Sequence, residues 1–179
     1  MGRGPRTVAF WVRAPEAFNP MQGYGIVNWG DIRVPGGAWQ IPVNGTEKDG
    51  PLGRLRIGTH WGQVIGITDL RDGQWHHCAV VMYGDEDGDP NTATHVLLYV
   101  DGQLEPAARK SVQAVDTVEP SSENRGTHGI WLGRNLGFEN EESPSVPIDG
   151  KFFRGSIDEM VICDTALSRD QILRLLNVN

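Results

Sequence analysis

The sequence predicts an all-β domain made of two antiparallel sheets packed as a sandwich. Its apolar residues fall in many short runs, most with a period of two, and the 23 Gly and 11 Pro supply frequent turns. Short strands at this spacing, separated by turn residues, are typical of sandwiches and barrels. The predicted strands are residues 7–13, 25–29, 38–43, 54–60, 63–67, 75–83, 95–100, 129–133 and 157–163.

Two of these runs predict different environments. Residues 75–83 are apolar on both faces, so we expect this strand in the middle of a sheet that is covered on both sides. In residues 54–60, Arg56 and His60 alternate with apolar residues such as Leu55. That alternation predicts one buried face and one face in solvent.

A short helix is predicted at the end of the chain. Residues 168–171, SRDQ, form a capping box in which the Ser168 hydroxyl and the Gln171 amide satisfy reciprocal backbone donors. Apolar residues at 172, 173, 175 and 176 then give this helix one face that can pack on the sandwich.

Length and charge narrow the range of functions. The 179 residues fit one domain, and the formal net charge of −7 disfavours nucleic acid and anionic lipid as partners. No apolar run approaches the roughly 20 residues that span a bilayer. Residues 1–6 lack the apolar stretch of a signal peptide, so export would need a signal outside this sequence. Cys78 and Cys163 lie in apolar segments, which favours two buried thiols over a bridge.

The six tryptophans divide into two groups. Trp11, Trp29, Trp39 and Trp75 lie within apolar strands, so the pattern assigns them to the core. Trp61 lies in a tight turn next to the solvent face of residues 54–60.

The most promising ligand patch therefore consists of Arg56, His60 and Trp61. An exposed aromatic ring beside hydrogen-bonding side chains is the arrangement that sugar recognition uses. The alternative is that Trp61 is part of a partly covered structural turn.

Several segments resemble the LamG-like jelly-roll family within the concanavalin A-like lectin and glucanase superfamily. They occur in the family's order and are residues 7–12 (TVAFWV), 72–81 (DGQWHHCAVV), 98–102 (LYVDG), 153–160 (FRGSIDEM) and 166–172 (ALSRDQI). The resemblance implies one jelly-roll domain over residues 1–179. Family members commonly have a further strand before the first matched one, and this sequence begins almost directly at residues 7–12, so either that strand is missing or another segment fills its edge.

For function, the resemblance implies a non-catalytic recognition module of a larger, exported protein. Such a module binds carbohydrate or another extracellular macromolecule outside the cytoplasm. One alternative is an endo-glucanase, whose Glu-x-Asp-x-(x)-Glu strand carries the two carboxylates of a retaining mechanism. The sequence lacks that triplet, since residues 139–142 (ENEE) have no intervening Asp and residues 157–159 (IDE) have no third carboxylate. The other alternative is a purely structural spacer domain.

A structural calcium ion is expected at Asp158. Alternation places Asp158 on one strand face with Met160 and Ile162, and a carboxylate on an apolar face needs a partner or a metal. The resemblance selects Asp158 because the aspartate of the matching strand often binds calcium in the superfamily. The alternative is a carboxylate that accepts backbone amides or pairs with an arginine.

Overall fold

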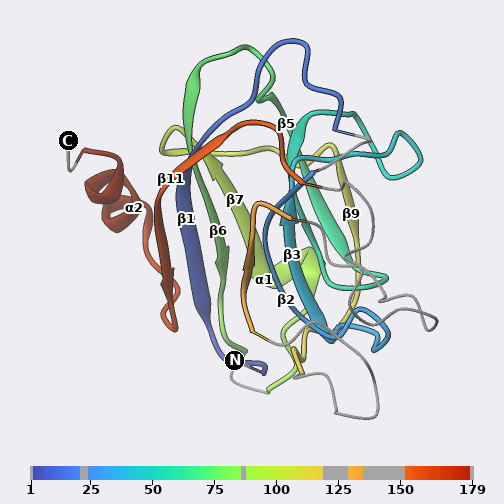
Figure 1. Cartoon of the computed structure of the whole chain (residues 1–179). Helices are drawn as coiled ribbons and strands as arrows, with labels where there is room; N and C mark the ends of the chain where they lie inside the picture. The colour runs from blue at the N-terminus through green and yellow to red at the C-terminus, as the bar shows by residue number, and fades with distance from the viewer. Residues whose placement is uncertain (1, 21–23, 86–87, 119–128, 135–151, 178–179) are drawn as a thin grey trace.

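The computed structural model describes residues 2–20, 24–85, 88–118, 129–134 and 152–177. Two antiparallel sheets face each other, and helix α2 (Arg169–Leu176) packs on the outer side of one of them (Figure 1). The predicted two-sheet jelly-roll sandwich with a C-terminal helix is thereby confirmed.

The five-stranded sheet runs in the order β11 (Ser156–Cys163), β1 (Arg6–Arg13), β6 (Trp75–Met82), β7 (Val96–Val100), β8 (Gln103–Leu104). The six-stranded sheet runs in the order β10 (Trp131–Leu132), β2 (Gly25–Gly30), β3 (Ala38–Pro42), β4 (Arg54–Gly58), β5 (Gln63–Asp69), β9 (Arg109–Ser111). The sequence did not predict β8, β9 or helix α1 (Thr92–His95), because segments of two to four residues are too short to show a period.

Strands β1 and β6 pair along their whole length and are buried on both faces over most of it. Their inner face packs against the six-stranded sheet in the main core. Their outer face carries small residues, Ala9 and Ala79, which pack against Ile172 of α2. Ser168 caps α2 with the predicted capping box. The central position and two-sided cover predicted for residues 75–83 are therefore correct for most of the strand.

The β7–β8 turn explains the Asp-Gly of the LYVDG segment. Asp101 and Gly102 have φ angles of 50° and 72°, the conformation of the tightest hairpin turns. The Asp101 carboxylate accepts the backbone N–H of His77 at 2.9 Å. A Cβ atom at Gly102 would lie 2.4 Å from a terminal methyl of Leu173 of α2, and the positive φ angle also favours glycine here.

Burial corrects one assignment among the tryptophans. Trp29 and Trp39 are in the core, with 3% and 0% of their surface exposed, and Trp11 is half-buried. Trp75 is 39% exposed, so its assignment to the core was wrong. It is the first residue of β6 and pairs with Arg13 at the end of β1, whose guanidinium lies 5.1 Å from the Trp75 ring centroid.

The two cysteines are free. Cys78 is fully buried, and burial raises the pKa of its thiol well above the ordinary value. Cys163 is only half-buried, and its Sγ lies 3.6 Å from the carbonyl oxygen of Thr165. Within the described ranges, no helix is long and apolar enough to cross a membrane.

A first prediction concerns His76, which links two carboxylates. Its Nδ1 lies 2.8 Å from Asp101 and its Nε2 lies 3.2 Å from Asp72. Burial alone would lower the pKa of His76, but the hydrogen bonds and charges of Asp101 and Asp72 outweigh it and raise this pKa. The stabilisation is therefore complete below the unfolded pKa of about 6.5 and is lost as pH rises through the higher folded pKa.

We expect the melting temperature of the wild type to exceed that of His76→Gln most at about pH 6, and the difference to shrink towards about pH 8. The measurement is a pair of thermal melts at each pH. A difference that stays constant, or grows with pH, contradicts a charged His76 in the folded state.

Candidate functional site

The turn between β4 and β5 presents the predicted aromatic residue. His60 and Trp61 occupy its two central positions with φ angles of 51° and 74°, and the Thr59 N–H donates to the Gly62 carbonyl at 2.9 Å. Such turns favour Asn-Gly, and a residue other than glycine in the left-handed region costs about 1–3 kcal/mol. Trp61 is 72% exposed, as the sequence suggested.

The backbone of this turn is anchored while its rings remain at the surface. The His60 carbonyl accepts the Gly36 N–H at 3.2 Å, and the Trp61 carbonyl accepts the Ser111 hydroxyl at 3.3 Å. The His60 and Trp61 rings stack with centroids 5.2 Å apart and an interplanar angle of 27°. The His60 ring thus lies against one face of the Trp61 indole, and we call this stacked pair the Trp61 plate.

A buried ion pair lies near the Trp61 plate. The Asp31 carboxylate, 3% exposed, accepts from Arg33 Nε at 2.9 Å. The hydrogen bond from Arg33 lowers the pKa of Asp31, and the nearby charge of His60 acts in the same direction. Arg33 remains partly exposed.

Arg56 is not the solvent-facing side chain that alternation suggested. Its Nη1 donates to Asp49 Oδ2 at 2.8 Å and to Asn44 Oδ1 at 3.3 Å, and only 19% of its side chain is exposed. The segment from Asn44 to Pro51 folds over this part of β4, which a two-residue period cannot reveal. The structure directs Arg56 towards Asp49, so its role in ligand binding stays a prediction.

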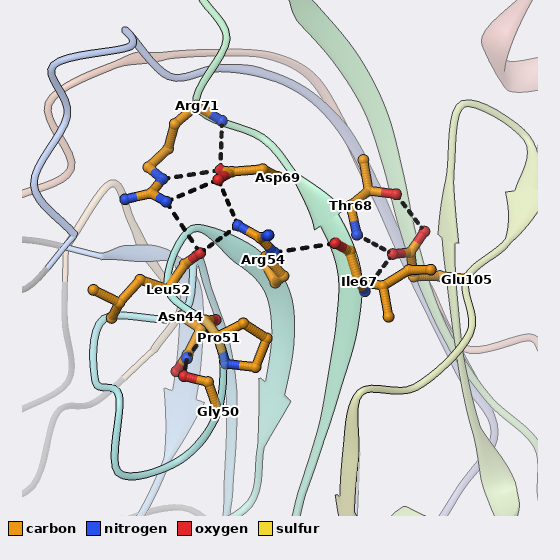
Figure 2. A network of polar contacts seen from close by, with 10 residues as sticks. All are labelled: Asn44, Gly50, Pro51, Leu52, Arg54, Ile67, Thr68, Asp69, Arg71 and Glu105. Atoms are coloured by element: carbon orange, nitrogen blue, oxygen red, sulfur yellow. Dashed lines mark hydrogen bonds and ion pairs between the residues drawn. The ribbon is translucent and has the colours of Figure 1, made fainter.

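Figure 2 shows how this covering segment is held. The Asn44 side-chain amide donates to the carbonyls of Gly50 and Pro51 at 3.0 and 2.8 Å. Beside it, Arg71 binds the Asp69 carboxylate through two nitrogens, and Arg54 binds it from β4. The hydrogen bonds from Arg71 lower the pKa of Asp69 to about 2, so the carboxylate stays ionised in mild acid.

A second carboxylate ties the two sheets together in Figure 2. Glu105, which follows β8, accepts the backbone N–H groups of Ile67 and Thr68 on β5 at 2.6 and 2.5 Å. A Cβ atom at Gly66 would lie 2.5 Å from Glu105, so glycine makes room for this contact. The base of the β4–β5 hairpin is therefore fixed from both sides.

The calcium expectation for Asp158 loses its structural premise. The β1–β11 register shifts between Ala9 and Trp11, and this bulge puts both Ile157 and Met160 on the inner core. Asp158 is consequently exposed on the outer side, and its carboxylate accepts the Glu159 N–H at 2.9 Å. The described residues include no group of three or more His, Cys, Asp or Glu side chains that could hold a metal ion.

Sequence reasoning missed a second cluster of site-like residues. Trp11, Trp75, Asp158 and Glu159 line a cavity of about 340 Å³ on the outer face of the five-stranded sheet. The available signal was the position of Trp75 at the start of its apolar run, immediately after the polar turn at residues 72–74.

These features define the class of the protein, a two-sheet jelly roll. The chain belongs to the concanavalin A-like lectin/glucanases superfamily, because the model of a laminin G family within it matches residues 2–173. A search of curated proteins found no match.

Three solved structures share the fold. Domain 4 of AbnA, a GH43 extracellular arabinanase from Geobacillus stearothermophilus in complex with arabinotriose, is 21% identical with a TM-score of 0.58, over 99% of this chain and 68% of that chain. A Bacteroides ovatus protein provisionally described as carbohydrate binding is 15% identical with a TM-score of 0.63, over 97% and 41%. The CBM40 of Ruminococcus gnavus IT-sialidase, bound to α2,3 sialyllactose, is 10% identical with a TM-score of 0.59, over 99% and 84%.

The second prediction tests the strain in the β4–β5 turn. Replacing His60 by Asn and Trp61 by Gly gives the residue pair that this turn prefers, so we expect the double variant to be about 1–2 kcal/mol more stable than wild type. Urea denaturation measures this as a higher midpoint with an unchanged slope. Val112→Ala, at another exposed position near the turn, is the control. A lower midpoint for the double variant would mean that the two rings stabilise the fold.

The third prediction concerns calcium at Asp158. If the ion binds, a hundredfold excess over its dissociation constant adds about 2.7 kcal/mol, or roughly 5–10 °C in melting temperature. Wild type and Asp158→Asn are melted in calcium and in chelator. A shift that the substitution removes supports the site, whereas coincident wild-type curves exclude it.

Proposed function

We propose that this domain is a non-catalytic carbohydrate-binding module of a larger exported protein, and that the Trp61 plate contacts the sugar. The observation that carries the proposal is the combination of exposure and strain at Trp61. A large aromatic side chain, 72% exposed, occupies a backbone conformation that glycine would adopt at lower cost. Strain of this kind is retained where a side chain has a role that the fold alone does not require.

The chemistry of the Trp61 plate suits a sugar. An indole ring offers a flat apolar surface to the C–H face of a pyranose, while the His60 ring stacks against one face of the indole and leaves the other face for the ligand. The plate is open, so it fits one or two residues of a longer chain better than a small enclosed ligand.

The comparisons support this class of ligand. The three structures described above are a domain of an arabinanase holding arabinotriose, a sialidase module holding sialyllactose and a protein provisionally described as carbohydrate binding. At 10–21% identity they share the fold with this chain, and on this fold the loops set the ligand. The extracellular arabinanase also supports an exported parent protein.

Catalysis is the rival function. A retaining glycosidase needs two carboxylates about 5–5.5 Å apart, one of which stays protonated to act as an acid. Beside the Trp61 plate, the buried Asp31 is ion-paired with Arg33 and its pKa is lowered, which makes it a poor acid. Residues 139–142 lie outside the described residues.

The fourth prediction is that Trp61→Ala weakens glycan binding about tenfold or more, as the loss of a central aromatic contact does. A glycan array with and without calcium identifies the ligand, and titration calorimetry gives the affinities. Leu104→Ala, which shortens another exposed apolar side chain, is the matched control. Unchanged affinity in Trp61→Ala moves the sugar site elsewhere. Release of reducing sugar that an Asp→Asn or Glu→Gln substitution abolishes establishes the glycosidase instead.

A further inference from the structure

A groove runs along the outer face of the five-stranded sheet, beyond α2. One part, about 340 Å³, is lined by Trp11, Trp75, Asp158 and Glu159. It continues into a second part of about 250 Å³, which shares Trp11 and Glu159 and reaches His77 and Leu175 of α2. We call the two parts together the Trp11 groove. Its first part falls within the size range of small-ligand sites.

The backbone next to the groove is strained. Ala9 pairs with Val161 and Trp11 with Asp158, so two residues of β11 stand opposite one residue of β1. Glu159 lies in this bulge with a φ angle of 47°. Bulges redirect side chains at binding sites, and a glutamate in the left-handed region is uncommon. Here the bulge turns Asp158 and Glu159 to the outer face, where both line the groove.

The groove combines aromatic surface with unpartnered polar atoms. Trp11 and His77 pack edge to face, with ring centroids 5.4 Å apart. Trp11 Nε1 and His77 Nδ1 are both buried and make no hydrogen bond. His77 is 2% exposed, and burial lowers the pKa of its imidazole, which is therefore neutral near pH 7. A buried polar atom without a partner costs free energy.

These groups select a ligand with hydroxyl groups. The two carboxylates only accept hydrogen bonds, so a ligand that meets them must donate. A sugar can donate a hydroxyl to Glu159 while its C–H face lies on an indole ring. A cation could also meet the carboxylates, but the guanidinium of Arg13 already lies over the Trp75 ring, 5.1 Å from its centroid, where a cation would stack. Two carboxylates in a chain of formal net charge −7 disfavour an anionic ligand.

We propose that the Trp11 groove is a second binding site, for a neutral sugar residue, on the sheet opposite the one that carries the Trp61 plate. It stands on its own observations and does not require the Trp61 plate to bind sugar. Two sites on opposite sheets let one domain hold two glycan chains, or two segments of one chain, which increases the apparent affinity for a polymer.

The test is an NMR titration of the whole domain that follows the indole N–H signals of Trp11, Trp75 and Trp61. The probes are xylohexaose, cellohexaose and mannohexaose, with sialyllactose as an acidic sugar and tetramethylammonium as a cation. We expect a neutral hexasaccharide to shift the Trp11 and Trp75 signals at millimolar concentration. The shifts should saturate with a single affinity, separate from any response of Trp61.

Two variants remove different parts of the groove, and one matched variant leaves it intact. Trp75→Ala should weaken the response of Trp11 about tenfold or more, and Glu159→Gln should weaken it severalfold while keeping the shape of the side chain. Trp61→Ala, which removes an exposed tryptophan elsewhere, should leave it unchanged. Thermal melts check that each variant is folded. If Trp75→Ala does not fold, the affinity of Glu159→Gln alone tests the groove.

The outcomes separate the two sites. If the Trp11 and Trp75 signals move and the Trp61 signal does not, the proposal for the Trp61 plate is wrong and the proposal for the groove is supported. Trp11 and Trp75 signals that move with none of the neutral sugars overturn the groove as a sugar site. A response only to sialyllactose, or only to tetramethylammonium, overturns it as well, because the groove then binds an anion or a cation and not a neutral sugar. The proposal for the groove is also wrong if Trp75→Ala and Glu159→Gln both bind the sugar with the wild-type affinity.

Discussion

The central pair of strands, β1 and β6, needs cover on both faces, and much of the structure follows from how that cover is supplied. The inner face is covered completely by the six-stranded sheet, so its residues are large and apolar. Among the described residues, the outer face is covered by α2, which has eight residues, together with Ala166 and Leu167 just before it. A helix of that length spans about 12 Å, less than the strands beneath it. The outer face of the pair is therefore divided into a covered part and an open part.

Side-chain size changes where the helix cover ends. Beneath α2 the strands carry Ala9 and Ala79, which let Ile172 approach closely. Further along the same face they carry Trp11, His77 and Trp75. Small residues are what close packing of a helix on a sheet requires, whereas large rings fill space that no helix occupies. The groove on this face is thus a direct result of a short helix on a longer pair of strands.

In the six-stranded sheet, contacts at the base of the β4–β5 hairpin hold the strained turn at its other end. At the base of this hairpin, Asp69 joins Arg54 to Arg71, and Glu105 fastens β5 to the other sheet. These contacts are charge-assisted, which makes them stronger than neutral hydrogen bonds. They fix both strands of the hairpin, so the turn must close in two residues whatever their preference. This explains how His60 and Trp61 remain in a conformation that they disfavour.

Alternation and capping predicted a sandwich or barrel of short strands with a C-terminal helix, and the family resemblance selected the jelly roll, but the site was predicted only in part. The β6 strand and the Ser168 cap depend on neighbours within a few residues, so both could be predicted from the sequence alone. The exposure of Trp61 was predicted because a turn between two strands lies beyond the strand ends, at the surface. Arg56 was misjudged because Asp49, its partner, belongs to a loop whose path no period reveals. The bulge at Glu159 likewise shifts the faces of β11 by one residue, so Asp158 was assigned to the wrong face.

In the part of the chain that the structure describes, four residues other than glycine have positive φ angles, and they show which strain is structural. The side chain of Asp101 accepts the His77 N–H and bonds His76, so its conformation serves the fold. His60 stacks on Trp61, while Trp61 and Glu159 make no side-chain hydrogen bond to any described residue. Both of these side chains are exposed, one on each sheet of the sandwich. A conformation that costs free energy, and that interior contacts do not require, is maintained for what the side chain meets outside the molecule. The distribution of strain thus points to the same two surfaces as the aromatic residues do.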